Sequence, residues 1–258
     1  MPVIESVSVI ACEIPLDHVT SFSTRTVSSR HYGLVKVRSV DGHEGIGFCY
    51  VGSRAGSLVK EAVEQLLGPL LIGQESRQTE GLWQTMYQES ILQGRSGSVM
   101  RGISILDTAL WDLNARSVGL PLHDYLGSLH RESVMAYASG GYYLDGKTPA
   151  KLGEEVAGYV AKGFKAVKIK TGRLSPKDEE ERIAAARDAI GPDVYLMLDA
   201  NNAWSDLPTA LEYMRRFEAY DPYWIEEPFS PDAIDLHARL ASRTSVTVAT
   251  GEIEVGRW

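Results

Sequence analysis

The sequence predicts an α/β protein in two parts, an N-terminal α+β capping domain over residues 1–127 and a (β/α) barrel of the TIM type over residues 128–258. The first part reads as a small antiparallel sheet followed by helices, whereas the second part alternates strand and helix throughout. In addition, charged strings end four successive apolar runs of the second part at nearly equal intervals, each about the length of a βαβ unit.

Three extended runs predict the N-terminal sheet. Residues 3–14 alternate between apolar and polar side chains, and residues 34–38 and 45–48 flank an Asp-Gly pair, which is typical of hairpin turns. The stretch 18–31 between these runs is polar and rich in Ser and Thr, so we expect a mobile loop there.

Three helices are expected after this sheet. Apolar residues recur on one helix face from Ser57 onward, and residues 79–93 read as a second helix. Residues 101–116 show the same helical spacing, and Gly119 and Pro121 predict where that third helix stops.

Strands and helices alternate after this point, which implies a parallel sheet. The strands are expected at residues 134–138, 166–170, 194–199, 223–226 and 246–249. The helices between them are expected at residues 150–162, 178–190, 207–219 and 233–242. About five strand units are therefore present, whereas a closed barrel has eight. Because open sheet edges promote aggregation, we expect a fragment of a longer product, roughly a hundred residues longer, rather than a genuine partial barrel.

Composition narrows the class of protein. The 258 residues carry a net charge of −8 with a pI near 5.3, which argues against nucleic acid as a partner. No apolar run approaches the roughly 18 residues of a membrane span, and we recognise no secretory signal. Cys12 and Cys49 are isolated, so we expect core thiols in a reducing cytoplasm rather than a disulfide framework or a zinc site.

Two lysines end the second of these strands. Lys168 and Lys170 are two positions apart, so their side chains point to the same face of the strand. If that face is the barrel interior, each ammonium group depresses the pKa of the other, and a nearby cation adds to the effect. A neutral amine then becomes available as a base near pH 7.

Carboxylates end the next three strands, at Asp199, Glu226 and Glu252. Counted from the second lysine, the successive intervals are 29, 27 and 26 residues. Converging carboxylates repel one another unless a cation neutralises them, and an all-oxygen set suits Mg²⁺. Glu227 faces away from its neighbour, so we expect it to bind a backbone group or a lysine, and Glu254 remains a competitor for the third position.

The strings KxK, DxN, EEP and GE, in this order, resemble the enolase superfamily, and specifically its mandelate racemase and muconate lactonizing branches. Residues 107–113, 121–122 and 126–127 are similar to the family's passage from capping domain to barrel. The resemblance covers nearly the whole chain.

The resemblance implies roles for individual residues. The three strand-end carboxylates would hold Mg²⁺, and Lys170 would be the base that removes the proton α to a substrate carboxylate. Lys168 would tune Lys170 and neutralise the developing enolate, and Asn201 would form a hydrogen bond to the substrate. Loops near residues 18–31 and 50–56 would close over it.

The implied reaction is Mg-dependent abstraction of an α proton with stabilisation of an enediolate. We expect an acid-sugar dehydratase or a racemase of the mandelate racemase type. A cycloisomerase or epimerase of the muconate lactonizing type, and a non-catalytic fragment or binding protein on the same scaffold, remain alternatives. The expected partner is a small carboxylic acid, either a sugar acid or a 2-hydroxy acid, in a homo-oligomer without nucleic acid or membrane. His237 precedes the fifth strand and is expected at the surface, so the second acid/base group stays unidentified.

Overall fold

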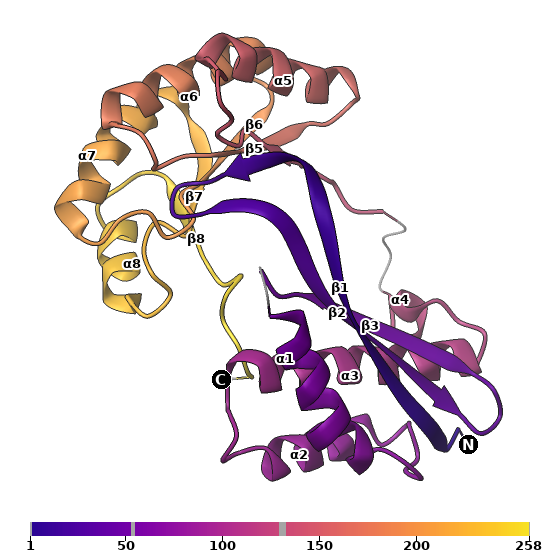
Figure 1. Ribbon diagram of the computed structural model, residues 1–258. Helices are drawn as coiled ribbons and strands as arrows, with labels where there is room; N and C mark the ends of the chain where they lie inside the picture. The colour runs from indigo at the N-terminus through magenta and orange to yellow at the C-terminus, as the bar shows by residue number, and fades with distance from the viewer. Residues whose placement is uncertain (1, 53–54, 129–132, 258) are drawn as a thin grey trace. The chain divides into compact units, whose positions relative to one another are not determined.

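The computed structural model describes residues 2–52, 55–128 and 133–257 (Figure 1). Contacts divide the chain into two compact units. The first comprises residues 1–17, 28–132 and 255–258, and the second comprises residues 18–27 and 133–254. No helix in the described ranges is both long and apolar enough to cross a membrane.

A three-stranded sheet has the order β1 (Ile4–Ser21), β2 (Thr26–Ser39) and β3 (Glu44–Tyr50). Its strands belong to the first unit except for residues 18–21 and 26–27, which belong to the second. Strands β2 and β3 pair antiparallel. This confirms the predicted antiparallel sheet, and the Asp-Gly pair indeed lies in the β2–β3 turn, where Gly42 has a φ of 87°.

Two glycines let the sheet pack closely on helix α3 (Gly97–Ser117). A Cβ on Gly45 would lie 2.1 Å from the carbonyl oxygen of Ala109, and one on Gly47 would lie 2.1 Å from that of Ile105. Any side chain at either position would therefore push the strand off the helix.

The other helical segments of this unit are short. They are α1 (Gly56–Glu61), the π-helix η1 (Ala62–Leu67), the 3₁₀ turn η2 (Gly68–Leu70), α2 (Thr79–Glu89) and α4 (Leu122–Tyr125). Helix α2 ends four residues before the predicted end, and α3 begins four residues before its predicted start. The apolar faces predicted from periodicity form the core, which includes Val59, Val63, Leu67, Ile103, Leu106 and Leu110.

The loop predicted for residues 18–31 is wrong. Strand β1 continues to Ser21 and β2 begins at Thr26, so only a short turn separates them, closed by a hydrogen bond from Phe22 N–H to the Arg25 carbonyl at 3.0 Å. Serine and threonine content indicated a loop, but β-branched residues also favour strands, and pairing between the two segments decides the outcome.

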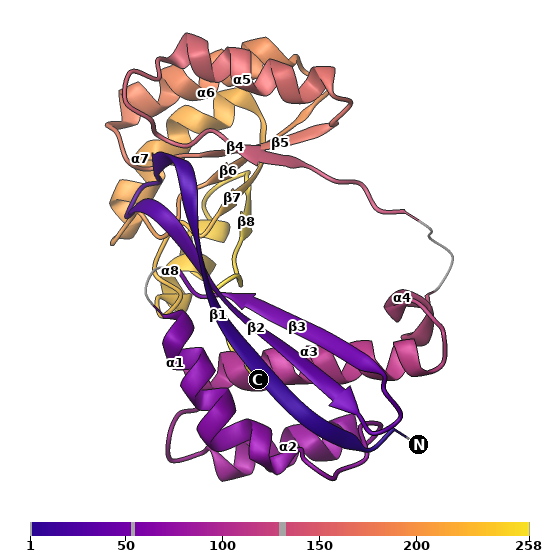
Figure 2. The same ribbon diagram turned by 45° about the vertical axis from the view of Figure 1, so that its right-hand side comes forward.

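The second unit contains a five-stranded parallel sheet in the order β4-β5-β6-β7-β8 (Figure 2). The strands are β4 (Ala138–Gly140), β5 (Ala166–Lys170), β6 (Tyr195–Asp199), β7 (Pro222–Glu226) and β8 (Thr247–Ala249). The helical segments are α5 (Pro149–Ala161), α6 (Pro176–Ile190), α7 (Leu207–Phe217), the 3₁₀ turn η3 (Glu218–Tyr220) and α8 (Ile234–Ala241). This confirms the predicted five strand units of a partial (β/α) barrel.

The first of these strands lies later than predicted. Residues 134–138 were expected to be extended, but β4 begins at Ala138, and Val134 is 84% exposed. An apolar run next to a strand is not a strand when no neighbour pairs with it.

Three helices of this unit begin at a side-chain cap followed by proline. Thr148, Ser175 and Asp206 each accept a hydrogen bond from the backbone N–H three residues later, before α5, α6 and α7 respectively. Because proline lacks an N–H and fits the first helical turn, each sequence fixes where its helix starts.

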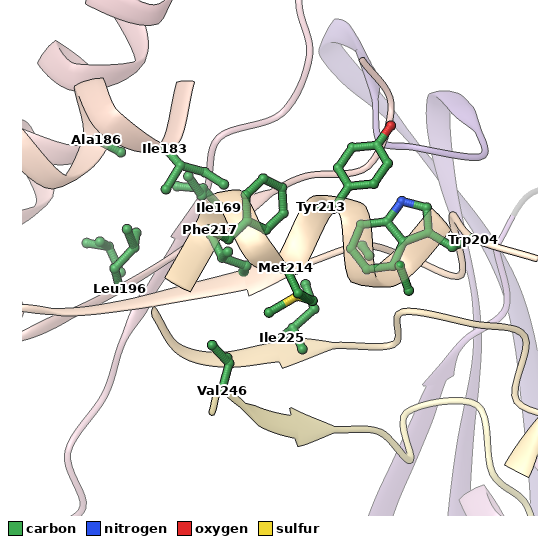
Figure 3. Packing of buried hydrophobic residues seen from close by; sticks show 14 of the residues in the cluster. Ile169, Ile183, Ala186, Leu196, Trp204, Tyr213, Met214, Phe217, Ile225 and Val246 are labelled. Carbon is green, nitrogen blue, oxygen red and sulfur yellow. The ribbon is translucent and has the colours of Figure 1, made fainter. Parts of the chain in front are cut away.

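The core of this unit lies between the sheet and the helices. Figure 3 shows Ile169, Leu196 and Ile225 from the strands against Met214 and Phe217 from α7. These apolar side chains pack the helices on the sheet, whereas polar residues occupy the carboxyl ends of the strands.

Candidate active site

The parallel register places the predicted residues in one row. Lys170 lies opposite Asp199 in the ladder, and Asp199 lies opposite Glu226. Because the strands are parallel, all three lie at the carboxyl ends, where (β/α) barrels carry their active sites.

The two lysines reach the same carboxylate. Lys170 Nζ lies 2.6 Å from Asp199 Oδ2, and Lys168 Nζ lies 3.5 Å from that same oxygen. Lys168 also donates to both carboxylate oxygens of Glu226, at 2.8 and 2.9 Å. Both lysine side chains therefore share one face of β5, as their two-residue spacing requires.

The expected mutual lowering of lysine pKa values is wrong for Lys168. Burial by itself lowers the pKa of Lys168, but the hydrogen bond with Glu226 and the charges of Asp199 and Glu226 together raise it above the ordinary lysine value. The direct contacts of Lys168 with carboxylates outweigh the neighbouring ammonium group, which was the only influence visible in the sequence.

Asn201 lies in the turn that follows β6. Its backbone N–H donates to Asp199 Oδ1 at 3.0 Å, and its φ of 45° is in the left-handed region. Within the described residues its Oδ1 is buried without a hydrogen-bond partner. A buried acceptor in the turn after Asp199 is suited to a hydroxyl group of a ligand.

Aromatic rings that the sequence analysis missed surround the lysine amines. The ring centroids of Phe22 and Tyr142 lie 5.8 and 5.4 Å from Lys170 Nζ, and that of Tyr137 lies 5.5 Å from Lys168 Nζ. Tyr142 follows β4, just as the charged strings follow the later strands. Its position after a strand end could therefore have identified it as a site residue from the sequence. Both lysines are buried, and a ring at this distance attracts an ammonium group through its π face.

The tip between β1 and β2 contacts the segment after β6. Ser23 Oγ donates to the carbonyl oxygen of Ala200, and Thr24 Oγ1 donates to that of Asn201 at 3.1 Å. The tip therefore lies beside the carboxylate strand, and the expectation that this region covers the substrate remains a proposal.

Glu227 is buried and pairs with no lysine in the described parts of the chain. Its carboxylate is 3.5 Å from Asn202 Nδ2, and its φ is 44°. Burial raises its pKa, and the charges of Glu252, Asp199 and Glu226 raise it further. The region therefore contains four carboxylates against two ammonium groups, and this excess of negative charge fits a divalent cation.

Glu252 follows β8 and is exposed. Within residues 2–52, 55–128 and 133–257, no three His, Cys, Asp or Glu side chains come together as a group that could hold a metal ion. Asp199 and Glu226 are adjacent in the sheet, so two of the three proposed ligands already lie side by side. The complete set, and the choice between Glu252 and Glu254, stay predictions.

His237 is not a surface residue. It is 8% exposed, its Nδ1 lies 3.0 Å from the carbonyl oxygen of Ala233, and its ring meets Phe229 edge to face at 5.3 Å. Its place on α8 and its contact with Phe229 account for this burial, which the position in the sequence did not show.

A pocket with a volume of about 220 Å³ lies next to Tyr142, one of the aromatic residues around the lysine amines. Its lining includes Ser21, Tyr142, Lys147 and Arg173. Arg173 is exposed, and its Nη1 lies 3.4 Å from the carbonyl oxygen of Phe22. The pocket is polar and open, and its wall shares Tyr142 with the lysine site.

Residues 5–127 match the family described as "Mandelate racemase / muconate lactonizing enzyme, N-terminal domain". Residues 151–258 match the one described as "Enolase C-terminal domain-like". The two matches leave only the segment around β4 and a few N-terminal residues uncovered.

Individual relatives differ in their named reactions. The chain is 39% identical to arabinonate dehydratase of Saccharolobus solfataricus over 86% of its length, and 36% identical to D-galactarolactone cycloisomerase of Agrobacterium fabrum over 89%. It spans 59% of the length of each of these two relatives.

A solved structure agrees with the fold. The racemase from Streptomyces coelicolor A3(2) with bound magnesium superposes with a TM-score of 0.91 at 32% identity, covering 97% of this chain and 70% of that one. The chain therefore belongs to the mandelate racemase / muconate lactonizing enzyme family of the enolase superfamily.

Proposed function

We propose that this chain abstracts the proton α to the carboxylate of a small sugar acid, with Lys170 as the base and Mg²⁺ as the cofactor. One observation carries the proposal: the amines of Lys170 and Lys168 meet Asp199 Oδ2 at the carboxyl ends of adjacent parallel strands. A base and a carboxylate set at that edge are what α-proton chemistry requires.

Asp199, Glu226 and Glu252 would hold the cation. Mg²⁺, when bound, supplies positive charge that stabilises the enediolate as its second negative charge develops. The excess of carboxylates over ammonium groups described above supports this assignment, and an all-oxygen set favours Mg²⁺ over softer metals.

The protein's own residues have separate tasks in this proposal. Lys170 accepts the α proton at Nζ in its neutral form, and the rings of Phe22 and Tyr142 lie beside that amine. Lys168, whose pKa is raised, keeps its charge and offsets negative charge on the substrate carboxylate. Asn201 Oδ1, which has no hydrogen-bond partner among the residues that the structure describes, accepts from a substrate hydroxyl.

The fate of the deprotonated substrate distinguishes the reactions. Loss of the β-hydroxyl as water gives a 2-keto-3-deoxy acid, and return of a proton to carbon gives a racemised or epimerised acid. We propose dehydration first, because arabinonate dehydratase is a relative at 39% identity. Cycloisomerisation is the second candidate, supported by the relative that is named for it.

Exchange of the α hydrogen tests the shared first step without requiring a product. The 258-residue chain is incubated in D₂O with Mg²⁺ and a panel of aldonates and aldarates, and the α-hydrogen signal is followed by ¹H NMR. We expect at least one sugar acid to lose this signal, and we expect Lys170→Ala to slow the loss by roughly a thousandfold.

Lys165→Ala is the matched control, because Lys165 is an exposed lysine directly before the same strand. It should exchange at the wild-type rate. An undiminished rate in Lys170→Ala would exclude Lys170 as the base, and no exchange of any panel member would contradict the proposed function.

A further inference from the structure

Arg182 and Glu179 form a buried ion pair on α6, and Arg182 binds the backbone of Lys170. Arg182 Nη1 donates to the carbonyl oxygen of Lys170 at 3.1 Å and pairs with Glu179 Oε2 at 2.9 Å. Arg182 Nη2 donates to the carbonyl oxygen of Gly141 at 2.8 Å. One rigid guanidinium group therefore ties the ends of β4 and β5 together.

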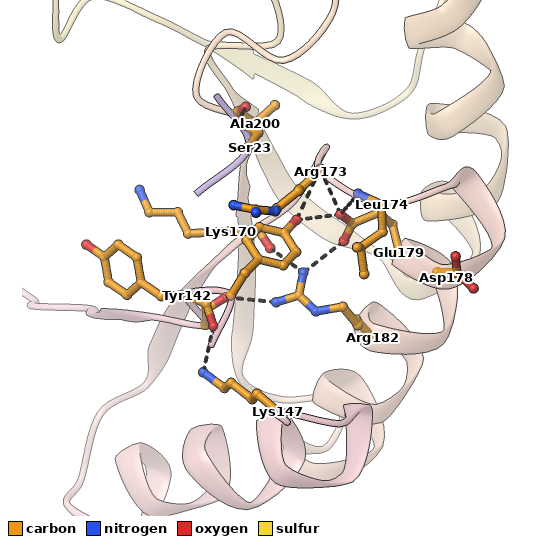
Figure 4. Close-up of polar contacts among 12 residues, drawn as sticks. Ser23, Tyr142, Lys147, Lys170, Arg173, Leu174, Asp178, Glu179, Arg182 and Ala200 are labelled. Carbon is orange, nitrogen blue, oxygen red and sulfur yellow. Dashed lines mark hydrogen bonds and ion pairs between the residues drawn. The ribbon is translucent and has the colours of Figure 1, made fainter. Parts of the chain in front are cut away.

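The partner carboxylate organises the chain that follows Lys170. Glu179 is fully buried, and its Oε1 accepts the backbone N–H groups of Arg173 at 3.0 Å and Leu174 at 2.9 Å (Figure 4). The same oxygen accepts the hydroxyl of Tyr143. Arg182 and Glu179 thus both form hydrogen bonds to backbone next to the proposed base.

Tyr143 extends this network to the tip between β1 and β2. Its backbone exchanges hydrogen bonds with that of Ser21, at 2.8 and 3.1 Å, and its ring lies 4.0 Å from the Arg182 guanidinium. Burial raises the pKa of Tyr143, and the charge of Glu179 raises it further, so the hydroxyl remains a donor. The next residue after Ser21 is Phe22, whose ring faces the Lys170 amine.

Stability alone is a weak reason for such a pair. Two buried charges lose their hydration on folding, and well-packed apolar residues often stabilise a fold equally well. A charged pair instead fixes directions, since each of its hydrogen bonds has a defined geometry. Here the fixed groups are backbone atoms of Lys170, of the segment that follows it and of the residue after β4.

We propose that Tyr143, Glu179 and Arg182 form a positioning unit that holds Lys170 and residues 18–27 in one arrangement. The proposal deepens the proposed function, because it rests on Lys170 being the base. None of the three needs to touch the substrate; they act through the backbone of Lys170 and through the tip that contributes Phe22.

Two conservative variants and one control test the unit. Tyr143→Phe removes only the hydroxyl, and Arg182→Lys keeps the charge but cannot reach its three acceptors in one plane. Glu180→Gln is the control, because Glu180 is the next residue on α6, is partly exposed and pairs with Arg216 at 2.7 Å.

Amide hydrogen exchange reads the coupling without any substrate. We expect Tyr143→Phe to speed exchange about tenfold both in residues 18–27 and in residues 170–174. The lost hydroxyl bond links Tyr143, whose backbone pairs with Ser21, to Glu179, which binds the N–H groups of Arg173 and Leu174. Glu180→Gln should leave both segments unchanged. Faster exchange in only one segment, or equal changes in the control, would overturn the coupling.

Substrate exchange reads the positioning. With a sugar acid that the wild-type chain deuterates, Arg182→Lys should lower the maximal rate per folded molecule about tenfold and leave the half-saturating concentration within twofold. An unchanged rate per folded molecule would show a merely structural role and overturn the proposal. A wild-type chain that deuterates no sugar acid contradicts the proposed function instead, and the amide-exchange arm still decides the coupling.

Discussion

The two units bury different kinds of polar residue. In the described part of the first unit the buried polar residues are all neutral, namely Ser39, Ser76, Ser90 and Asn114. In the second unit six charged residues are buried, namely Lys168, Lys170, Glu179, Arg182, Asp199 and Glu227. Burying a charge costs free energy of desolvation unless the charge is paired. The second unit therefore has a desolvation cost that the described part of the first unit lacks.

The location of these charges shows what the difference means. In the first unit Ser76 Oγ donates to Asn114 Oδ1 at 2.6 Å, and this neutral pair ties a loop to α3. In the second unit the charges lie at or directly behind the ends of β5, β6 and β7. Neutral polar groups are sufficient for packing, whereas charges concentrated at one sheet edge indicate chemistry.

The largest expected effect concerns the buried charges. Arg182→Ala leaves the fully buried Glu179 carboxylate without its partner and should lower the free energy of unfolding by about 4 kcal/mol. Urea denaturation followed by amide exchange in each unit measures it. A loss below 1 kcal/mol would show that the pair is dispensable for folding, and the contrast between the units would then lose its energetic basis.

Overpacking should dominate in the first unit. Gly45→Ala places a Cβ 2.1 Å from the Ala109 carbonyl oxygen and should lower the free energy of unfolding by about 3 kcal/mol. Gly81→Ala is the matched control on α2, where a Cβ meets nothing within 4 Å, and it should raise stability by about 0.5–1 kcal/mol. Equal effects of the two changes would contradict the close approach of β3 to α3.

Loss of a helix N-cap should lower the free energy of unfolding by different amounts in the two units, and both effects should be smaller than those above. Asp206 accepts the N–H of Thr209 at 2.8 Å before α7, so Asp206→Ala should lower the free energy of unfolding by about 1 kcal/mol. Ser96 precedes α3 in the first unit without a side-chain cap hydrogen bond, and Ser96→Ala should be nearly neutral. Thermal denaturation of the two variants tests the difference, and a larger loss for Ser96→Ala would contradict it.

Lowering the pH should remove a stabilising contribution of Glu155 in the second unit and restore one of Asp107 in the first. Burial alone would raise the pKa of Glu155, but bonds from the Gly141 N–H, Lys147 and Tyr159 lower it, so its stabilising contribution is present above about pH 4.3 and lost below. Burial raises the pKa of Asp107, so its contribution is present below about pH 3.9 and lost as pH rises through the folded value.

Amide exchange between pH 3 and pH 7 measures both contributions. Glu155→Gln should destabilise the second unit at pH 7 more than at pH 3, and Asp107→Asn should stabilise the first unit at pH 7. The same sign for both variants at pH 7 would show that one of the two environments is misassigned.

Features that follow from the periodicity of one segment, or from the shared direction of parallel strands, were predictable from the sequence. The βα alternation and the shared face of Lys168 and Lys170 follow from periodicity, because strand residues two apart point the same way. The row formed by Lys170, Asp199 and Glu226 follows from strand ends, because parallel strands align their carboxyl ends at one edge.

Features that depend on pairing between distant segments were not predictable. The strands over residues 18–31 form because two polar segments pair with each other, and composition cannot show this pairing. The raised pKa of Lys168 depends on a carboxylate 58 positions away in the sequence. Likewise Tyr143 and Glu179 are separated by 36 positions, so nothing local marked them as partners.

Calorimetric titration with Mg²⁺ tests the central claim most directly, that the second unit keeps its charges to hold a cation beside a base. The wild-type chain should bind one Mg²⁺, and Asp199→Asn, Glu226→Gln and Glu252→Gln should each weaken binding at least tenfold, whereas Glu254→Gln should bind like the wild type. Wild-type affinity in Asp199→Asn or Glu226→Gln, or no Mg²⁺ binding by the wild-type chain, would contradict the account.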